Sequence, residues 1–226
     1  MYQTWGKLLF LHWPVPAERL RPHIPDCLEI DTYGATAWIA ITPLTIWAIR
    51  PSFLPPVPVL SSSHELNVRT YVHRDGVPGV WFFSLDAANP LAVWGARLGF
   101  ALPYFQAIMR LGEQDRTIRY RSRRTHPGSP AAEFRATWTR GDRLPELQPD
   151  TLDFFLIERY CLYTVRKQQL YCGRIFHDPW RLCRATLSEL ESTMLSLQGL
   201  PSPAGEPLLH AQAEPLTVGI WRLERL

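Results

Sequence analysis

The sequence has no long uninterrupted hydrophobic run, and only two of its 24 basic residues are lysines. Its most apolar stretch, residues 35–49, contains three threonines and a proline and is shorter than the ~20 residues that a membrane-spanning helix needs. One basic residue precedes the apolar segment near the N-terminus, and no small-residue cleavage pattern follows it. We therefore expect a cytoplasmic protein without a secretory signal or a membrane partner.

Motifs for metals and cofactors are also missing. None of the four cysteines forms a CxxC pair, which excludes a zinc ribbon and favours reduced thiols. His177 lies between Cys172 and Cys183 at spacings that match no metal motif, so we expect no metal site. Other histidines, His12 among them, show no partner pattern and are expected to be exposed or to act as caps. The chain lacks a Walker loop, a dinucleotide fingerprint and a nucleophile elbow, and we expect no cofactor.

The charge pattern argues against a nucleic-acid partner. The net charge of +3 comes from arginines that are interleaved with acidic residues and form no long basic block. Proteins that bind nucleic acids usually gather their basic residues on one face or along one segment. We therefore expect no nucleic-acid partner and a small-molecule ligand instead.

The length and composition favour one packed domain. A chain of 226 residues buries most of its apolar surface, and 46% of these residues are hydrophobic. We assign residues 1–226 to a single domain, which is compatible with either a monomer or a homo-oligomer. Proline-rich segments at 51–58 and 201–207 are expected to be surface loops.

Strand patterns dominate the chain. Alternating or continuous apolar segments separated by turn residues predict four hairpins. The predicted pairs are 27–32 with 35–46, 66–73 with 80–85, 105–110 with 116–124, and 161–166 with 170–177. Further strands are expected at 6–13, 134–140, 181–187, 208–213 and 216–223.

Helices are expected to be few and short. One begins with Asn89 as the N-cap and Pro90 at the first helical position, and ends at Gly99. Others are expected near residues 17–21 and 150–160. Many antiparallel strands with a few outer helices predict an α+β fold, a mostly antiparallel β-barrel with a few short helices.

The segment 63–73 carries the first candidate site residues. In a strand, Glu65, Asn67 and Arg69 share one face while the intervening apolar residues share the other. From the pattern alone, an ordinary amphipathic strand with its polar face in water is the better explanation. If the polar face lines an apolar interior instead, the pKa of Glu65 is raised and the residue becomes a candidate general acid or base.

A second polar strand, 116–124, places Tyr120 and Arg124 on the face that begins apolar, while Arg121 lies on the other face. An inward Arg124 needs a carboxylate, which Glu65, Asp86 or a bound ligand would supply. A structural salt bridge is the commoner outcome for such a residue. Both outcomes remain open from the sequence.

The order of features between residues 63 and 105 resembles the acetoacetate decarboxylase superfamily. The segment SHELNVRTYV carries Glu65, and WFFSLDAANPLAVWGARLGFALPYF carries Asp86, Arg97 and Gly99. The resemblance implies that Glu65 faces a substrate cavity. In that superfamily a lysine that forms a Schiff base follows this point, but here the chain reads Leu102-Pro103-Tyr104-Phe105. We therefore expect no imine chemistry, since an exposed Lys7 or Lys167 is a poor nucleophile at neutral pH.

The whole chain also resembles the YqjF-like family, which is grouped with the acetoacetate-decarboxylase-like barrel. The segments FLHWPVPAERLRPHIP, YRSRR, LIERYCLYTV and GRIFHDPW carry this resemblance. It implies an internal cavity but no assigned reaction. We expect a small apolar or carbonyl- or carboxylate-bearing ligand in this cavity; the alternative is an enzyme that uses Glu65 as general acid or base. The expected ligand-binding residues are Asn67, Arg69, Arg97, Tyr104, Tyr120, Arg124 and His177.

Overall fold

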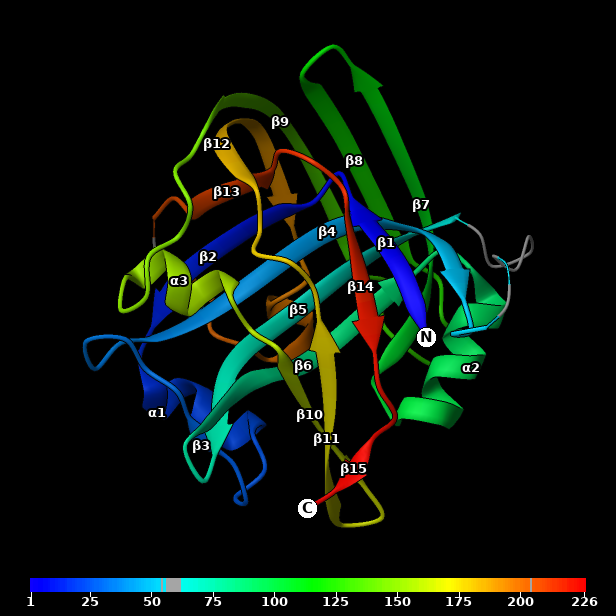
Figure 1. The fold of residues 1–226 in the computed structure, drawn as a ribbon, viewed down its shortest axis with the longest axis vertical. Helices are drawn as coiled ribbons and strands as arrows, with labels where there is room; N and C mark the ends of the chain where they lie inside the picture. Colours follow the sequence, from blue (N-terminus) through cyan, green and yellow to red (C-terminus); the bar gives the residue numbers. More distant parts are fainter. Residues whose placement is uncertain (54, 56–61, 204) are drawn as a thin grey trace.

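A computed structural model describes residues 1–53, 55, 62–203 and 205–226 (Figure 1). The predicted loop at 51–58 lies largely outside the described residues, as does residue 204 of the loop at 201–207. Strands make up most of the fold and join into one 15-stranded sheet. Their bounds are β1 Tyr2–Gly6, β2 Leu9–Val15, β3 Glu29–Ile30, β4 Ala37–Arg50, β5 Ser62–Arg74, β6 Val77–Ala87, β7 Tyr104–Gln114, β8 Thr117–Arg124, β9 Glu133–Arg143, β10 Cys161–Arg166, β11 Gln169–Phe176, β12 Leu182–Ser192, β13 Leu208–Gln212, β14 Leu216–Ile220 and β15 Glu224–Arg225.

Three of the predicted hairpins are confirmed and one is wrong. The pairs β5–β6, β7–β8 and β10–β11 are antiparallel neighbours in the predicted order. The expected pairing of 27–32 with 35–46 does not form, because β3 pairs with β5 through Glu29–His73 and Ile30–Val72. The two edges of β4 pair with β2 and β5, so no edge is left for β3. In the predicted turn, Tyr33 and Thr36 form an isolated bridge.

The sheet is mixed, and β6 explains why. Most pairings are antiparallel, as predicted, but β6 pairs in parallel with β7 and with β10. Parallel neighbours need a crossover connection, and α2 (Pro90–Phe100) supplies it between β6 and β7. A parallel pairing leaves no local turn signal, so the sequence pattern did not reveal it.

The pairings close into two rings that share the strands β4, β5 and β6. One ring runs through β1, β4, β5, β6, β10, β11 and β14 and back to β1. The other runs through β2, β4, β5, β6, β7, β8, β9, β12 and β13 and back to β2. Because side chains alternate along a strand, β5 presents one face to each ring.

The two faces of β5 differ as the sequence predicted. Leu66 and Val68 belong to the larger hydrophobic cluster, which also contains Phe134 and Trp138 of β9. Residues of the opposite face border the smaller cluster, to which Leu44 of β4 belongs. The odd-numbered face of β5 therefore borders the cavity described below, inside the first ring.

Within the described residues, three α-helices accompany the sheet, and Figure 1 shows α2 and α3 at opposite sides of it. In α2 the Asn89 side chain accepts hydrogen bonds from the backbone N–H groups of Leu91 and Ala92, as a cap should. The helix ends at Phe100, one residue beyond the predicted stop, because Ala101 takes the left-handed conformation at φ 51°. The remaining helices are α1 Ala17–Leu20 and α3 Leu152–Ile157, with 3-10 turns at Arg21–His23 and Ser196–Gln198.

The expected helix at 150–160 is shorter than predicted. It begins after Thr151, whose hydroxyl caps the N–H of Phe154, and its backbone leaves the helical region at Glu158. None of the helices among the described residues is long and apolar enough to cross a membrane. All four cysteines are free thiols, and only Cys27 is exposed.

Candidate functional site: an interior cavity

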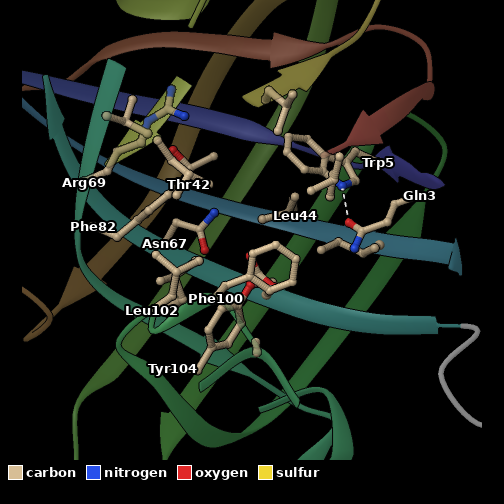
Figure 2. A pocket seen from close by; sticks show the side chains of 18 of the residues that line it. Gln3, Trp5, Thr42, Leu44, Asn67, Arg69, Phe82, Phe100, Leu102 and Tyr104 are labelled. Atoms are coloured by element: carbon tan, nitrogen blue, oxygen red, sulfur yellow. Dashed lines mark hydrogen bonds between the residues drawn. The ribbon is translucent and has the colours of Figure 1, made fainter. Parts of the chain in front are cut away.

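A cavity of about 310 Å³ lies inside the first ring of strands. Every strand of that ring contributes to the lining, and α2 adds residues from one side. Figure 2 shows Trp5 and Gln3 toward one end of this wall, Thr42, Arg69 and Phe82 toward the other, and Leu44 between them. The lining is mostly apolar, and a few polar side chains interrupt it, which is typical of small-molecule sites.

Glu65 lies in this lining because β5 turns its odd-numbered face toward the cavity. The side chain is 8% exposed, and the Tyr104 hydroxyl donates a hydrogen bond of 3.0 Å to its Oε2. Burial raises the pKa of Glu65 to about 7, although hydrogen bonds from Tyr104 and Asn67 oppose the shift. Near neutral pH this carboxyl is therefore able to give up or to accept a proton.

Tyr104 reaches the cavity as the first residue of β7, directly opposite Leu85 of β6. Burial and the neighbouring Glu65 raise the pKa of this phenol well above its ordinary value. Tyr104 consequently keeps its proton and acts as a hydrogen-bond donor while Glu65 titrates. The structure thus brings together two residues that lie far apart in the sequence.

Asn67 and Arg69 follow Glu65 on the same face of β5 and line the same cavity. The guanidinium of Arg69 lies 5.4 Å from the centroid of the Phe10 ring and 5.8 Å from that of Tyr71. A second lining arginine, Arg159, is paired with Asp31 at 2.6 Å.

His177 also lines the cavity, at the point where the chain leaves β11. Its Nδ1 lies 2.8 Å from the carbonyl oxygen of Asp178, and its ring stacks on Tyr160 with centroids 4.7 Å apart. Burial lowers the pKa of His177, so the ring is neutral around pH 7. Among the described residues no group of His, Cys, Asp and Glu side chains is arranged to hold a metal ion.

Three of the predicted ligand-binding residues lie outside the cavity lining and contact other parts of the protein. Arg97 donates to the backbone oxygen of Tyr104 at 2.7 Å, and the Tyr120 hydroxyl donates to that of Glu65 at 2.9 Å. Arg124 binds Asp86 through both carboxylate oxygens, at 2.6 to 3.1 Å. Arg97 and Tyr120 therefore fix the backbone of two cavity residues, Tyr104 and Glu65. Arg124 forms its ion pair outside the cavity lining.

The aromatic residue that β6 contributes to the lining is Phe82. Strict alternation counted back from Leu85 would place Phe83 and Trp81 in the cavity, but Phe82 and Val80 line it instead. A β-bulge causes this change, because Val68 pairs with Ser84 while the next residue, Arg69, pairs with Phe82. The extra residue reverses the alternation of the strand. Trp81 and Phe83 line a separate hollow, and Tyr71 is buried against α3.

Two further residues of this region were missed. Thr42 lines the cavity from the apolar strand β4, which the sequence presented only as a hydrophobic run. His12 is fully buried on β2, so the expectation that it is exposed or a cap is wrong. In the sequence, each of these positions is marked by a polar residue, Thr42 or His12, inside an apolar segment.

Neither lysine belongs to the cavity lining. Lys7 forms an ion pair with Glu113 at 2.8 Å, and Lys167 lies in the turn between β10 and β11. The side chains that line the cavity therefore offer carboxyl, phenol, amide, imidazole and guanidinium groups, but neither lysine amine.

Comparison with known families identifies the chain. The model of the DUF2071 family, described as an uncharacterized conserved protein, matches residues 2–215. The chain belongs to this family. It is also 40% identical over 225 residues to the uncharacterized protein YqjF of Bacillus subtilis strain 168, with 100% of this chain and 92% of YqjF covered. The YqjF-like resemblance inferred from the sequence is confirmed.

Solved structures relate this DUF2071 protein to the acetoacetate decarboxylase fold. An acetoacetate decarboxylase-like enzyme from Sphingomonas wittichii RW1 superposes with a TM-score of 0.65 at 11% identity, covering 100% of this chain and 92% of that one. An acetoacetate decarboxylase gives 0.64 at 17% identity, with coverages of 100% and 88%. The enduracididine biosynthesis enzyme MppR gives 0.66 at 10% identity, with 100% and 87%. At these identities the likeness concerns the fold alone.

Proposed function

We propose that the protein binds a small molecule with an apolar body and a carbonyl or carboxylate group, inside the cavity and without forming an imine. One observation carries this proposal: the Glu65–Tyr104 pair is set into an otherwise apolar interior wall. In such sites apolar area supplies affinity, and a few placed polar groups fix the orientation of the ligand. We interpret the ring of strands around the cavity as the barrel that the sequence predicts.

The fold relatives give this proposal further support. MppR is described in complex with pyruvate and with the condensation product of pyruvate and imidazole 4-carboxaldehyde. Pyruvate carries both a carbonyl and a carboxylate, which are the two groups named here. Neither lysine lies in the cavity lining, and the N-terminal amine of Met1, which does, donates to the carbonyl oxygen of Ile220; this supports the proposal of non-covalent binding.

Binding is tested with three phenylalkyl probes of similar size, 4-phenyl-2-butanone, 4-phenylbutanoate and 4-phenylbutanamide, titrated by calorimetry. We expect at least one probe to bind with a stoichiometry of one. The variant Ala96→Phe places a ring in the cavity from α2 and should weaken this binding about tenfold or more, since it removes space and buried contacts. Leu98→Phe adds a ring to the exposed side of the same helix and should leave the affinity unchanged.

The proposal fails if none of the three probes binds. It also fails if Ala96→Phe and Leu98→Phe weaken binding equally, because the bound probe would then lie outside the cavity.

A second candidate is an enzyme that uses Glu65 as general acid or base on a carbonyl compound. The pKa of about 7 favours it, because acid–base groups work best when their pKa lies near the operating pH. In this case Glu65 removes a proton from the carbon next to the carbonyl and returns a deuteron from heavy water. NMR should then show deuterium entering 4-phenyl-2-butanone, about 100-fold more slowly in Glu65→Gln. If the ketone binds but no deuterium enters it, the enzymatic role is excluded and the binding role remains.

A further inference from the structure

Five buried polar atoms near one end of the cavity have no hydrogen-bond partner. They belong to four residues on three neighbouring strands, β2, β4 and β5. Buried polar atoms in native proteins are nearly always paired, and an unpaired group calls for a water, an ion or a ligand as its explanation. The atoms are His12 Nδ1 and Nε2, Thr42 Oγ1, Asn67 Oδ1 and Arg69 Nε.

The strand register places these residues on one face. His12 of β2 lies opposite Ala40 of β4, and Ala40 lies opposite Arg69 of β5. Thr42 lies opposite Asn67 in the next row on the same face. With strands about 4.8 Å apart, the backbones of His12 and Arg69 are roughly 10 Å apart, and only the methyl group of Ala40 lies between them. Figure 2 shows Arg69, Thr42 and Asn67 grouped on this part of the wall.

Arg69 differs from the other cavity arginine in its charge balance. Arg159 has Asp31 as its counter-ion, whereas no carboxylate lies within ion-pair distance of Arg69 in the described part of the chain. The Arg69 head group donates a long hydrogen bond, 3.5 Å from Nη2 to the carbonyl oxygen of Leu156, and lies beside the Tyr71 hydroxyl, which is neutral. The Arg69 guanidinium lies close to two aromatic rings, and its buried Nε–H has no acceptor. This arrangement favours the binding of an anion from outside the protein.

We propose that Arg69, with Thr42 and Asn67 beside it in the cavity lining, forms a subsite for the carboxylate of an organic acid. Arg69 supplies the charge, and Asn67 and Thr42 receive a neighbouring polar group of the ligand, while His12 lies next to this group on the same face and outside the lining. This inference rests on the function proposed above and names its ligand class.

The distance to Glu65 adds a constraint on that ligand. Arg69 and Glu65 are four residues apart on one strand, so their backbones are separated by about 13 Å. An acid with an apolar body thus spans from a carboxylate at Arg69 to the region of Glu65 and Tyr104. The subsite accordingly selects amphipathic monocarboxylates over neutral molecules of the same shape.

The test compares 4-phenylbutanoate with 4-phenylbutanamide by calorimetry at pH 8, where the acid is fully ionised. On the unmodified protein the acid should bind at least tenfold more tightly than the amide. Arg69→Gln should weaken acid binding about 10- to 150-fold, the range expected for a lost hydrogen bond to a charged group, and should leave amide binding nearly unchanged. Arg69→Lys, which keeps the charge, should recover part of the loss.

Arg121→Gln is the matched control, because Arg121 is exposed on β8 away from the cavity. Equal affinity of acid and amide for the unmodified protein, a comparison that needs no variant, overturns the subsite and leaves the proposed binding function intact. Equal losses in Arg69→Gln and Arg121→Gln also overturn it. Absence of binding by all three probes overturns the subsite and the proposed function together.

Discussion

Replacing Arg124 with methionine should lower the free energy of unfolding by about 3–5 kcal/mol, the usual cost of removing one partner of a buried ion pair. Arg124 and Asp86 are 4% and 0% exposed, and three hydrogen bonds of 2.6 to 3.1 Å join them. The guanidinium also lies 4.0 Å from the centroid of the Phe105 ring. The variant leaves the Asp86 carboxylate buried without its counter-charge.

Chemical denaturation at pH 7 measures this loss, and two further variants interpret it. Arg121→Met, on the exposed face of the same strand, should change stability by less than about 0.5 kcal/mol. The double variant Asp86→Leu/Arg124→Met should recover a large part of the stability, because no charge then remains buried. A loss below about 1 kcal/mol for Arg124→Met would show that water reaches Asp86.

The Asp86–Arg124 pair also shows what the sequence could not predict, namely the partner of Arg124. Alternation along β8 placed Arg124 on the inward face, and the structure agrees. The choice between Asp86, Glu65 and a ligand as its partner depends on the pairing of β6 with β7, which is parallel. Parallel neighbouring strands are joined through a helix, so no local turn sequence determines their register.

Local patterns predicted the fold best where strands meet through short turns. The hairpins β5–β6, β7–β8 and β10–β11 and the Asn89 cap of α2 all follow from neighbouring residues. The β3–β4 hairpin failed because competition for the edges of β4 is a tertiary effect. Pattern reasoning had no access to that competition.

The candidate site was predicted in part. Period-two alternation placed Glu65, Asn67 and Arg69 on one face, and the family resemblance pointed that face into a cavity. The choice of Phe82 over Phe83 depends on a bulge, whose position is set by the packing of both strands. Thr42 and His12 lie in apolar segments that are typical of ordinary core, so their position on the same face as Asn67 and Arg69 could be assigned only from the strand register.

The pH dependence of stability should reveal Glu65 directly. Its pKa rises from 4.5 to about 7 on folding, because burial disfavours the charged form. Between these two values the folded state holds a proton that the unfolded state has released, so stability falls as the pH rises. The slope for one such proton is about 1.4 kcal/mol per pH unit, and the total contribution is about 3 kcal/mol between pH 4.5 and 7. This stabilisation is fully present below pH 4.5.

Unfolding free energies of the unmodified protein and of Glu65→Gln, measured from pH 4 to 8, isolate this contribution, because glutamine does not titrate. The difference between the two should shift in favour of Glu65→Gln as the pH rises from 4.5 to 7, and should level off above that range. Tyr104→Phe removes a hydrogen bond that lowers the pKa of Glu65, so in this variant the decline should extend to higher pH. Parallel curves for the unmodified protein and Glu65→Gln would mean that the pKa of Glu65 is not raised. The cavity would then be wet enough to keep the carboxylate charged, and the acid–base role would lose its physical basis.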